Sequence, residues 1–140
     1  MICYAVIDTN VLVSALISNH TDTATVQLVG RLISGEIVPV YSNEIMREYR
    51  EVLGRKKFKF DKDMINYILL AVERYGVMID PSASGVILPD MKDLPFYEVA
   101  MDKREEEAYL VTGNLKHFPA QPFIVTAREM LNILDGKVVS

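Results

Sequence analysis

Short apolar runs alternate with longer amphipathic segments along the chain. The short runs are rich in β-favouring residues and predict strands at residues 2–7, 36–40, 77–79, 109–111 and 123–125. Between them, hydrophobic residues recur with helical spacing and predict helices at residues 11–17, 23–33, 42–53, 61–75, 95–104 and 127–134. Strands that alternate with helices in this way are typical of an α/β fold, with a mostly parallel central sheet and helices on both faces.

Residues at the ends of these segments support the boundaries. Asn10 is a favourable N-cap for the first helix, and Gly54 and Gly76 follow two later helices. Residues 82–93 form the longest stretch without a regular pattern. The chain has 140 residues and is 50% hydrophobic, which is enough for one sizeable core, so we expect a single domain over residues 1–140.

Composition narrows the class of protein. The first residues lack the features of a secretory signal, and no apolar stretch is long enough to span a bilayer, so we expect a soluble, cytoplasmic protein without a membrane partner. Cys3 is the only cysteine, which excludes an internal disulfide and a cysteine-based zinc cluster. The net charge of -4 argues against a general nucleic-acid coat protein, but a local basic groove is compatible with it.

Polar residues interrupt the apolar pattern close to where predicted strands end and helices begin. They are Asp8-Thr9-Asn10 after the first strand, Ser42-Asn43-Glu44 after the second, Thr112-Gly113-Asn114 after the fourth, and Asp93 near the start of a helix. In open α/β sheets, ligands bind beyond the carboxyl ends of the strands. We therefore expect these polar residues to converge at one edge of the sheet.

Each of these acids also has a purely structural interpretation. Asp8 can begin a turn, Glu44 can complement the dipole of the helix that it starts, and Asp93 can be an N-terminal residue of its helix. For any one residue the structural interpretation is the better one. Helix capping gives no reason, however, for all of them to recur at strand ends, so together they favour a functional site.

Carboxylates that converge repel one another unless a cation neutralises them. Oxygen ligands without cysteine or histidine favour Mg²⁺ or Mn²⁺ over zinc. Such an ion can lower the pKa of a bound water and stabilise the charge on a phosphate under attack. The acids therefore point to hydrolysis of a phosphodiester.

The order of these segments resembles the PIN-domain ribonucleases. The segment VIDTNVLVSAL at residues 6–16 is similar to the family's opening strand and first acid, and YSNEIMREYREVL at residues 41–53 is similar to its second-acid helix. The segment DLPFYEVAMDKREEEAYLVTGNLKHFP at residues 93–119 resembles the third acid, its helix and the strand with the Thr-Gly turn. The resemblance spans nearly the whole chain, and three motifs in one order are more specific than any one of them.

The resemblance implies a three-layer α/β/α fold and a divalent-metal-dependent endoribonuclease. Carried over to this chain, the metal-ligating acids are Asp8, Glu44 and Asp93, and Asn10 and Thr112 match polar positions that assist the site. Within the family the chain resembles toxin components of bacterial and archaeal toxin-antitoxin pairs. That likeness implies an RNA substrate, a cognate antitoxin and a homodimer.

Asn114 departs from the family pattern, in which many members have a fourth aspartate. An amide can ligate through its oxygen or hold a metal-bound water, but it supplies no charge, so the number of metal ions stays open. Asp90 and Glu98 are candidate replacements, although neither matches the family's motif. An alternative function is a non-catalytic RNA-binding or regulatory module that lost activity through Asn114, but three retained acids favour the enzyme.

A third interpretation is a small α/β phosphotransfer receiver, which also gathers acids at strand ends. The helix that carries Glu44 and the turn at residues 112–114 fit it poorly. Two further features have open roles. The segment GRKKFKF at residues 54–60 can bind phosphates and stack on bases. It can also be a solvated helix connection with its two phenylalanines in the core or in a dimer contact, which is the better interpretation. His117 can assist proton transfer, although a surface or structural role is the better interpretation.

Overall fold

The protein contains a five-stranded sheet with the strand order β3-β2-β1-β4-β5, seen in a computed structural model that describes residues 2–136. The strands are β1 (Tyr4–Ile7), β2 (Val38–Tyr41), β3 (Val77–Met78), β4 (Tyr109–Val111) and β5 (Ile124–Val125). Every pairing between them is parallel. The expected parallel α/β sheet is therefore confirmed, and its central strand is β1.

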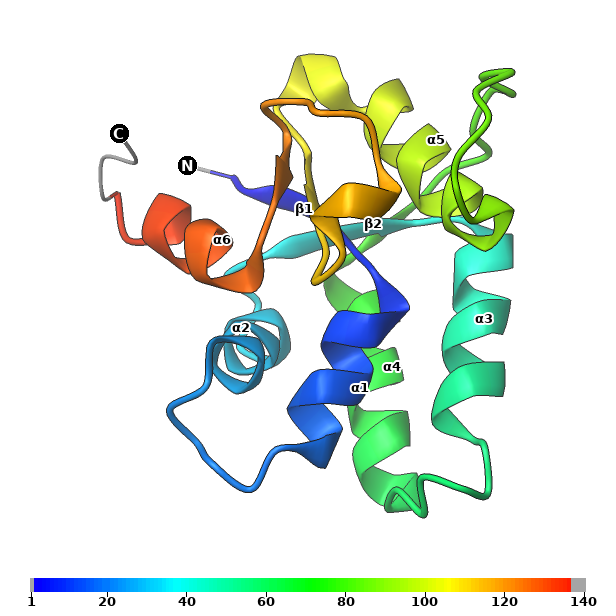
Figure 1. Cartoon of the computed structure of the whole chain (residues 1–140). Coiled ribbons are helices and arrows are strands. Elements are labelled where there is room, and N and C mark those ends of the chain that lie inside the picture. The colour runs from blue at the N-terminus through cyan, green and yellow to red at the C-terminus, as the bar shows by residue number, and fades with distance from the viewer. Residues whose placement is uncertain (1, 137–140) are drawn as a thin grey trace.

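Helices cover both faces of this sheet (Figure 1). They are α1 (Thr9–Ile17), α2 (Ala24–Ile33), α3 (Asn43–Leu53), α4 (Lys62–Tyr75), α5 (Leu94–Asp102) and α6 (Ala127–Leu134). Helix α5 packs on one face of the sheet, against β1, β2 and β4. Helices α4 and α6 contact the sheet from the other face, and α2 packs against these two helices. Helix α3 lies beside α1 and α5. This arrangement is the expected three-layer α/β/α fold.

The central strand explains why the site forms where it does. Ala5, Val6 and Ile7 are buried, as expected for a strand covered on both faces. The backbone N–H of Asp8 still donates to the carbonyl of Val111 at 2.9 Å, so β1 stays paired with β4 up to its last residue. The chain then enters α1 at once, which leaves Asp8 at the carboxyl end of the sheet's middle strand.

The start of α1 differs from the sequence prediction. Asn10 was expected to be the N-cap, but the helix begins at Thr9 and its N-cap residue is Asp8. The pairing of Asp8 with β4 explains this difference, because Asp8 is the only residue between the end of β1 and the first residue of α1. Asn10 instead lies in the first turn, and its side-chain oxygen accepts from the backbone N–H of Gly113 at 3.5 Å.

The irregular residues before α5 are fastened to that helix by two of its acids. The carboxylate of Asp102 accepts from the backbone N–H of Ser82 at 2.9 Å, and Glu98 accepts from the backbone N–H of Ser84. Glu98 is thereby engaged in holding this loop and does not line the cleft described below. None of the helices within residues 2–136 combines the length and the apolar character that a membrane span requires.

Candidate active site

A cleft of about 570 Å³ opens at the carboxyl ends of β1 and β4. Its walls come from the start of α1, the middle of α3, the connection between α3 and α4, the turn before α5 and the loop after β4. The lining residues with polar side chains are Asp8, Thr9, Asn10, Glu48, Glu51, Arg55, Asp90, Lys92, Asp93, Asn114 and His117. Segments that are far apart in the sequence thus supply one acidic hollow.

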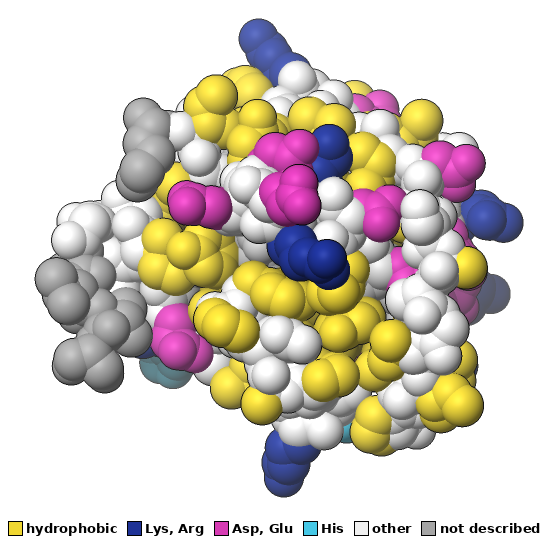
Figure 2. All heavy atoms as spheres, turned by 90° about the horizontal axis from the view of Figure 1, so that it is seen from above, with side chains coloured by type: hydrophobic (Ala, Val, Ile, Leu, Met, Phe, Trp, Pro, Cys, Tyr) yellow, Lys and Arg dark blue, Asp and Glu magenta, His cyan; other side chains and the backbone are white. Residues whose placement is uncertain are grey.

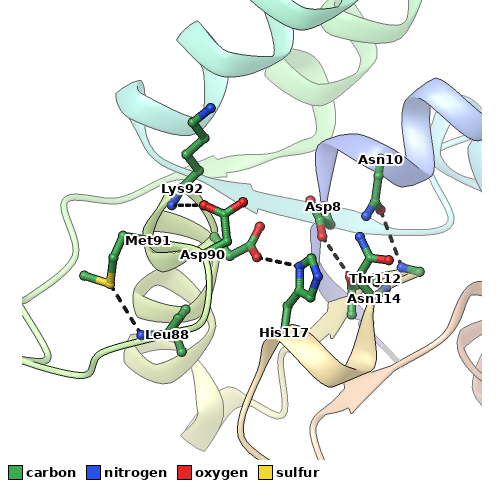
Figure 3. A network of polar contacts seen from close by, with 11 residues as sticks. Asp8, Asn10, Leu88, Asp90, Met91, Lys92, Thr112, Asn114 and His117 are labelled. Atoms are coloured by element: carbon green, nitrogen blue, oxygen red, sulfur yellow. Dashed lines mark hydrogen bonds and ion pairs between the residues drawn. The ribbon is translucent and has the colours of Figure 1, made fainter.

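Asp8 is held at the base of this cleft by β4. The hydroxyl of Thr112, which is fully buried, donates to Oδ2 of Asp8 at 2.8 Å, and the backbone N–H of Asn114 donates to that hydroxyl at 3.0 Å (Figure 3). Thr112 therefore supports Asp8 from behind and is not part of the cleft lining. Only 5% of Asp8 is exposed. The hydrogen bonds from Asn114 to Thr112 and from Thr112 to Asp8 fix the orientation of its carboxylate.

Burial raises the pKa of Asp8 to about 6. The loss of hydration is the main cause, and the hydrogen bond from Thr112 opposes it. The nearby charges of Asp93 and Glu48 raise the pKa further. The ionised form of Asp8 is therefore disfavoured, and a cation bound in the cleft would stabilise it.

The second acid in the cleft is Glu48, not Glu44. The hydroxyl of Thr9 donates to Oε2 of Glu48, which ties α3 to the residue after Asp8. Burial raises the pKa of Glu48, the hydrogen bond from Thr9 lowers it, and the charge of Asp93 raises it. Glu48 therefore shares both the location and the electrostatic environment of Asp8.

Glu44 is exposed and does not line the cleft. It borders a neighbouring hollow together with Met91, Pro95 and Phe96, and Glu48 lies between the two hollows. The structure therefore places Glu48, one helical turn further along α3, in the cleft, and does not bring the expected Glu44 there. The reason is the docking of α3, because the buried Tyr49 donates its hydroxyl to the carbonyl of Ile7 and brings the second turn of the helix to the end of β1.

Asp93 reaches the cleft from the single 3₁₀ turn at Met91–Asp93 that precedes α5. Its Oδ2 lies 3.1 Å from Nδ1 of His117, which comes from the loop after β4 (Figure 3). Burial raises the pKa of Asp93, contact with His117 lowers it, and the charge of Asp90 raises it. His117 was not among the expected site residues, and the signal for it was its position three residues after Asn114.

The remaining polar side chains surround these acids. Asn10 and Asn114 both line the cleft, as expected from the sequence. Asp90 also lines it, and its carboxylate accepts from the backbone N–H of Lys92 at 3.0 Å. Two cations, Lys92 and Arg55, stand at the wall, and Arg55 pairs with Glu51 at 2.8 Å. The cleft thus combines oxygen donors with positive charge at its edge.

The donor set suits a hard divalent cation in its chemistry. Asp8, Glu48 and Asp93 supply carboxylate oxygens, and all three pKa values are raised by burial in a shared acidic environment. Within residues 2–136, no group of three or more acid, histidine or cysteine side chains is already arranged as a metal site. The fit is therefore one of ligand type and charge, with no preformed coordination geometry.

Comparison with known proteins gives the family. A family model described as PIN domain matches residues 4–116, which include β1, α3, α5 and β4 and every residue that lines the cleft except His117. No curated protein and no solved structure matches the chain. PIN domains are generally nucleases that hydrolyse phosphodiester bonds. Because the family model matches most of the chain, and the parallel sheet and the acidic cleft agree with it, the chain belongs to the PIN-domain family.

Proposed function

We propose that this PIN-domain protein is a divalent-metal-dependent endoribonuclease that cleaves RNA phosphodiester bonds. The observation that carries the proposal is the buried Asp8 beside two further acids: desolvation is the main cause that raises its pKa to about 6, and the charges of Asp93 and Glu48 raise it further. Crowded carboxylates of this kind repel one another unless a cation neutralises them. A divalent cation that takes part in hydrolysis would do so.

Asp8, Glu48 and Asp93 would hold Mg²⁺ or Mn²⁺, and the sequence-based assignment of Glu44 is not carried into this proposal. When bound, the ion supplies Lewis-acid stabilisation of the attacked phosphate and activates a water molecule. Thr112 keeps Asp8 oriented, and Thr9 and His117 do the same for Glu48 and Asp93. Partners of this kind behind a ligand strongly affect metal affinity and activity.

The remaining polar residues of the cleft would act on the substrate. Asn10 and Asn114 expose amide groups that can orient a water or a phosphate oxygen. Lys92 and Arg55 can attract the phosphates of RNA to an otherwise acidic surface. Because the amide of Asn114 adds no negative charge to the three acids, we propose that they hold one metal ion and not two.

The decisive experiment is cleavage of labelled RNA by purified protein and by Asp8→Asn. Wild-type protein should cleave in Mg²⁺ or Mn²⁺ and stop in EDTA, and Asp8→Asn, purified in parallel, should be inactive. Equal, metal-independent cleavage by both proteins would reveal a contaminating nuclease. RNA binding by the wild type without any cleavage would instead favour a non-catalytic RNA-binding module.

The biological role that we propose is the toxin of a toxin-antitoxin pair, acting in the cytoplasm as a homodimer. Support for a protein partner comes from an apolar cavity of about 740 Å³ beside the cleft, which shares Phe58 with it. An antitoxin segment with an apolar face would mask the cleft by covering this cavity. Growth arrest on expression of the wild type but not of Asp8→Asn would support the role, and sedimentation as a monomer at high concentration would remove the dimer.

A further inference from the structure

The connection between α3 and α4, residues 55–60, reaches the acidic cleft with a surface that hydrolysis itself does not use. Arg55 and Phe58 line the cleft, and Lys56, Lys57 and Lys59 are exposed. Among residues 2–136, none of these three lysines is within ion-pair distance of a carboxylate. Their charges are therefore free to meet an external anion.

The two phenylalanines of this segment have different roles. Their rings are stacked, with centroids 4.9 Å apart and an angle of 3° between the planes. Phe60 packs against the hydrophobic core, but Phe58 is outside that cluster in the described part of the chain and lines both the cleft and the neighbouring apolar cavity. The interpretation of the segment as a plain helix connection accounts for Phe60. It does not account for Phe58, which Phe60 supports as a rigid flat surface at the cleft.

A cation lies over this aromatic surface. The Nζ atom of Lys57 is above the Phe58 ring, 5.1 Å from its centre, so a base that stacks on this face has to displace the flexible Lys57 side chain. Lys59, which separates the two phenylalanines in the sequence, has a left-handed backbone conformation with a φ of 55° and is exposed. An aromatic residue with a lysine on either side of it in the sequence matches a base with its flanking phosphates, since every base has a face for stacking and every phosphate attracts a lysine.

The distribution of charge favours a polyanion as the occupant. The carboxylates of the cleft repel phosphate, so an RNA strand needs positive charge close by to approach them. On the face above α5, Lys and Arg side chains stand apart among carboxylates and hydrophobic groups (Figure 2). Residues 55–59, by contrast, contain four cations and no acid, and their first residue pairs with Glu51 at the cleft wall.

We propose that residues 55–60 bind the RNA strand beside the cleft, with an unpaired base stacked on Phe58 and its phosphates on Lys57 and Lys59. This inference rests on the proposed ribonuclease function and names how that site holds its substrate. It selects single-stranded RNA, because the faces of a base inside a duplex are already covered by its neighbours. Phe58 and the two lysines are thus positioning residues.

Binding of a labelled single-stranded oligonucleotide of uridine, measured by fluorescence anisotropy in EDTA, tests the proposal without cleavage. Phe58→Leu keeps an apolar side chain but loses the ring, and we expect about ten-fold weaker binding, whereas Phe58→Tyr should bind like the wild type. The double variant Lys57→Gln/Lys59→Gln should lower the slope of log affinity against log salt by about 1.4. Arg104→Gln/Arg128→Gln removes the same charge from two exposed positions outside the cleft and should leave the slope unchanged.

The outcomes separate this inference from the proposed function. Wild-type cleavage together with unchanged RNA binding in Phe58→Leu and in the double lysine variant would overturn the inference and leave the ribonuclease. Weaker binding in those variants, when the wild type cleaves no RNA, would support the RNA site and refute the enzyme. Equal affinity of the wild type for duplex and single-stranded RNA would overturn base stacking on Phe58. The lysine substitutions are on the surface, so they remain informative if Phe58→Leu fails to fold.

Discussion

Glu44 and Glu48 lie one turn apart on α3, and their surroundings contrast sharply. Glu44 is exposed in the first turn, whereas Glu48 faces the cleft, accepts a hydrogen bond from Thr9 and has its pKa raised mainly by burial. One helical turn is about 5.4 Å, so the two carboxylates differ only by that step along the helix axis. The contrast teaches that the docking of a helix decides which of its acids lines the cleft. The acid that is nearest in sequence to the preceding strand is not always the one that does so.

The most direct way to break this comparison is to neutralise each acid in turn. Glu48→Gln removes a carboxylate that the proposed site needs, and we expect RNA cleavage to fall by about 100-fold or more. Glu44→Gln removes the same charge one turn away and should keep activity within about two-fold. Initial cleavage rates at saturating Mn²⁺, with protein folding checked by circular dichroism, measure both. Equal losses would show that the position on the helix is irrelevant.

The charge crowding around Asp8 makes a second prediction, on stability against pH in EDTA. Asp8 has its ordinary pKa in the unfolded chain and a pKa of about 6 in the folded protein, so the folded state binds the proton more tightly. The free energy of unfolding should therefore fall as the pH rises from about 4 to 6, by up to about 3 kcal/mol, and stay low at neutral pH.

Asp8→Asn keeps an acceptor for Thr112 but removes the charge, so it should flatten this dependence and be more stable than the wild type at pH 7. Glu48→Gln should lower the pKa of Asp8 and flatten the curve in part, whereas Glu44→Gln is the matched control. Urea denaturation at several pH values provides the free energies. A curve for Asp8→Asn as steep as that of the wild type would contradict the assigned cause.

A smaller effect on activity is expected at Thr9, which contacts Glu48 and not Glu44. Thr9→Val removes the hydroxyl that donates to Glu48 but keeps the shape of the side chain. Because partners that orient a ligand typically contribute 10-fold to 100-fold in metal affinity or activity, we expect about a ten-fold higher Mn²⁺ requirement. Manganese titration of the cleavage rate measures it. Thr25→Val, which removes a hydroxyl on α2, controls for the substitution itself.

The smallest effect that we expect is at Asn114. Asn114→Asp adds a carboxylate to a cleft that already holds three proposed ligands and two further acids, so it should strengthen Mn²⁺ binding by a few-fold at most or leave it unchanged. Isothermal titration calorimetry on both proteins is the measurement. A large gain in affinity and a second bound ion would mean that this position, and not α3, limits the site.

Some parts of the site were predictable from the sequence because they depend on local pattern. The apolar run that ends at Asp8 and the Thr-Gly turn after β4 mark two neighbouring strand ends, and parallel pairing then brings Asp8 and Thr112 together. Asp93 was placed correctly near the start of α5. The order of strands and helices was predicted for the same reason, since periods of two and of 3.6 residues are local properties.

Other parts depend on tertiary contacts that periodicity does not encode. The rotation of α3 follows from the hydrogen bond between Tyr49 and Ile7, so the choice between Glu44 and Glu48 could not be made from spacing alone. Asn10 and Asp8 are equally favourable N-caps by residue type, and the pairing of Asp8 with β4 set the helix start. The contact of His117 with Asp93 joins two loops, and loop conformation was the least predictable element.

The anchoring of Asp8 has a consequence for mutational tolerance. The hydrogen bond that fixes the Thr112 hydroxyl comes from the main chain of Asn114, not from its amide side chain. Any residue other than proline can donate the same bond, so the side chain at position 114 can change while the buried carboxylate keeps its support. Substitutions at position 114 should therefore leave the orientation of Asp8 unchanged, whereas position 112 has to keep a hydroxyl.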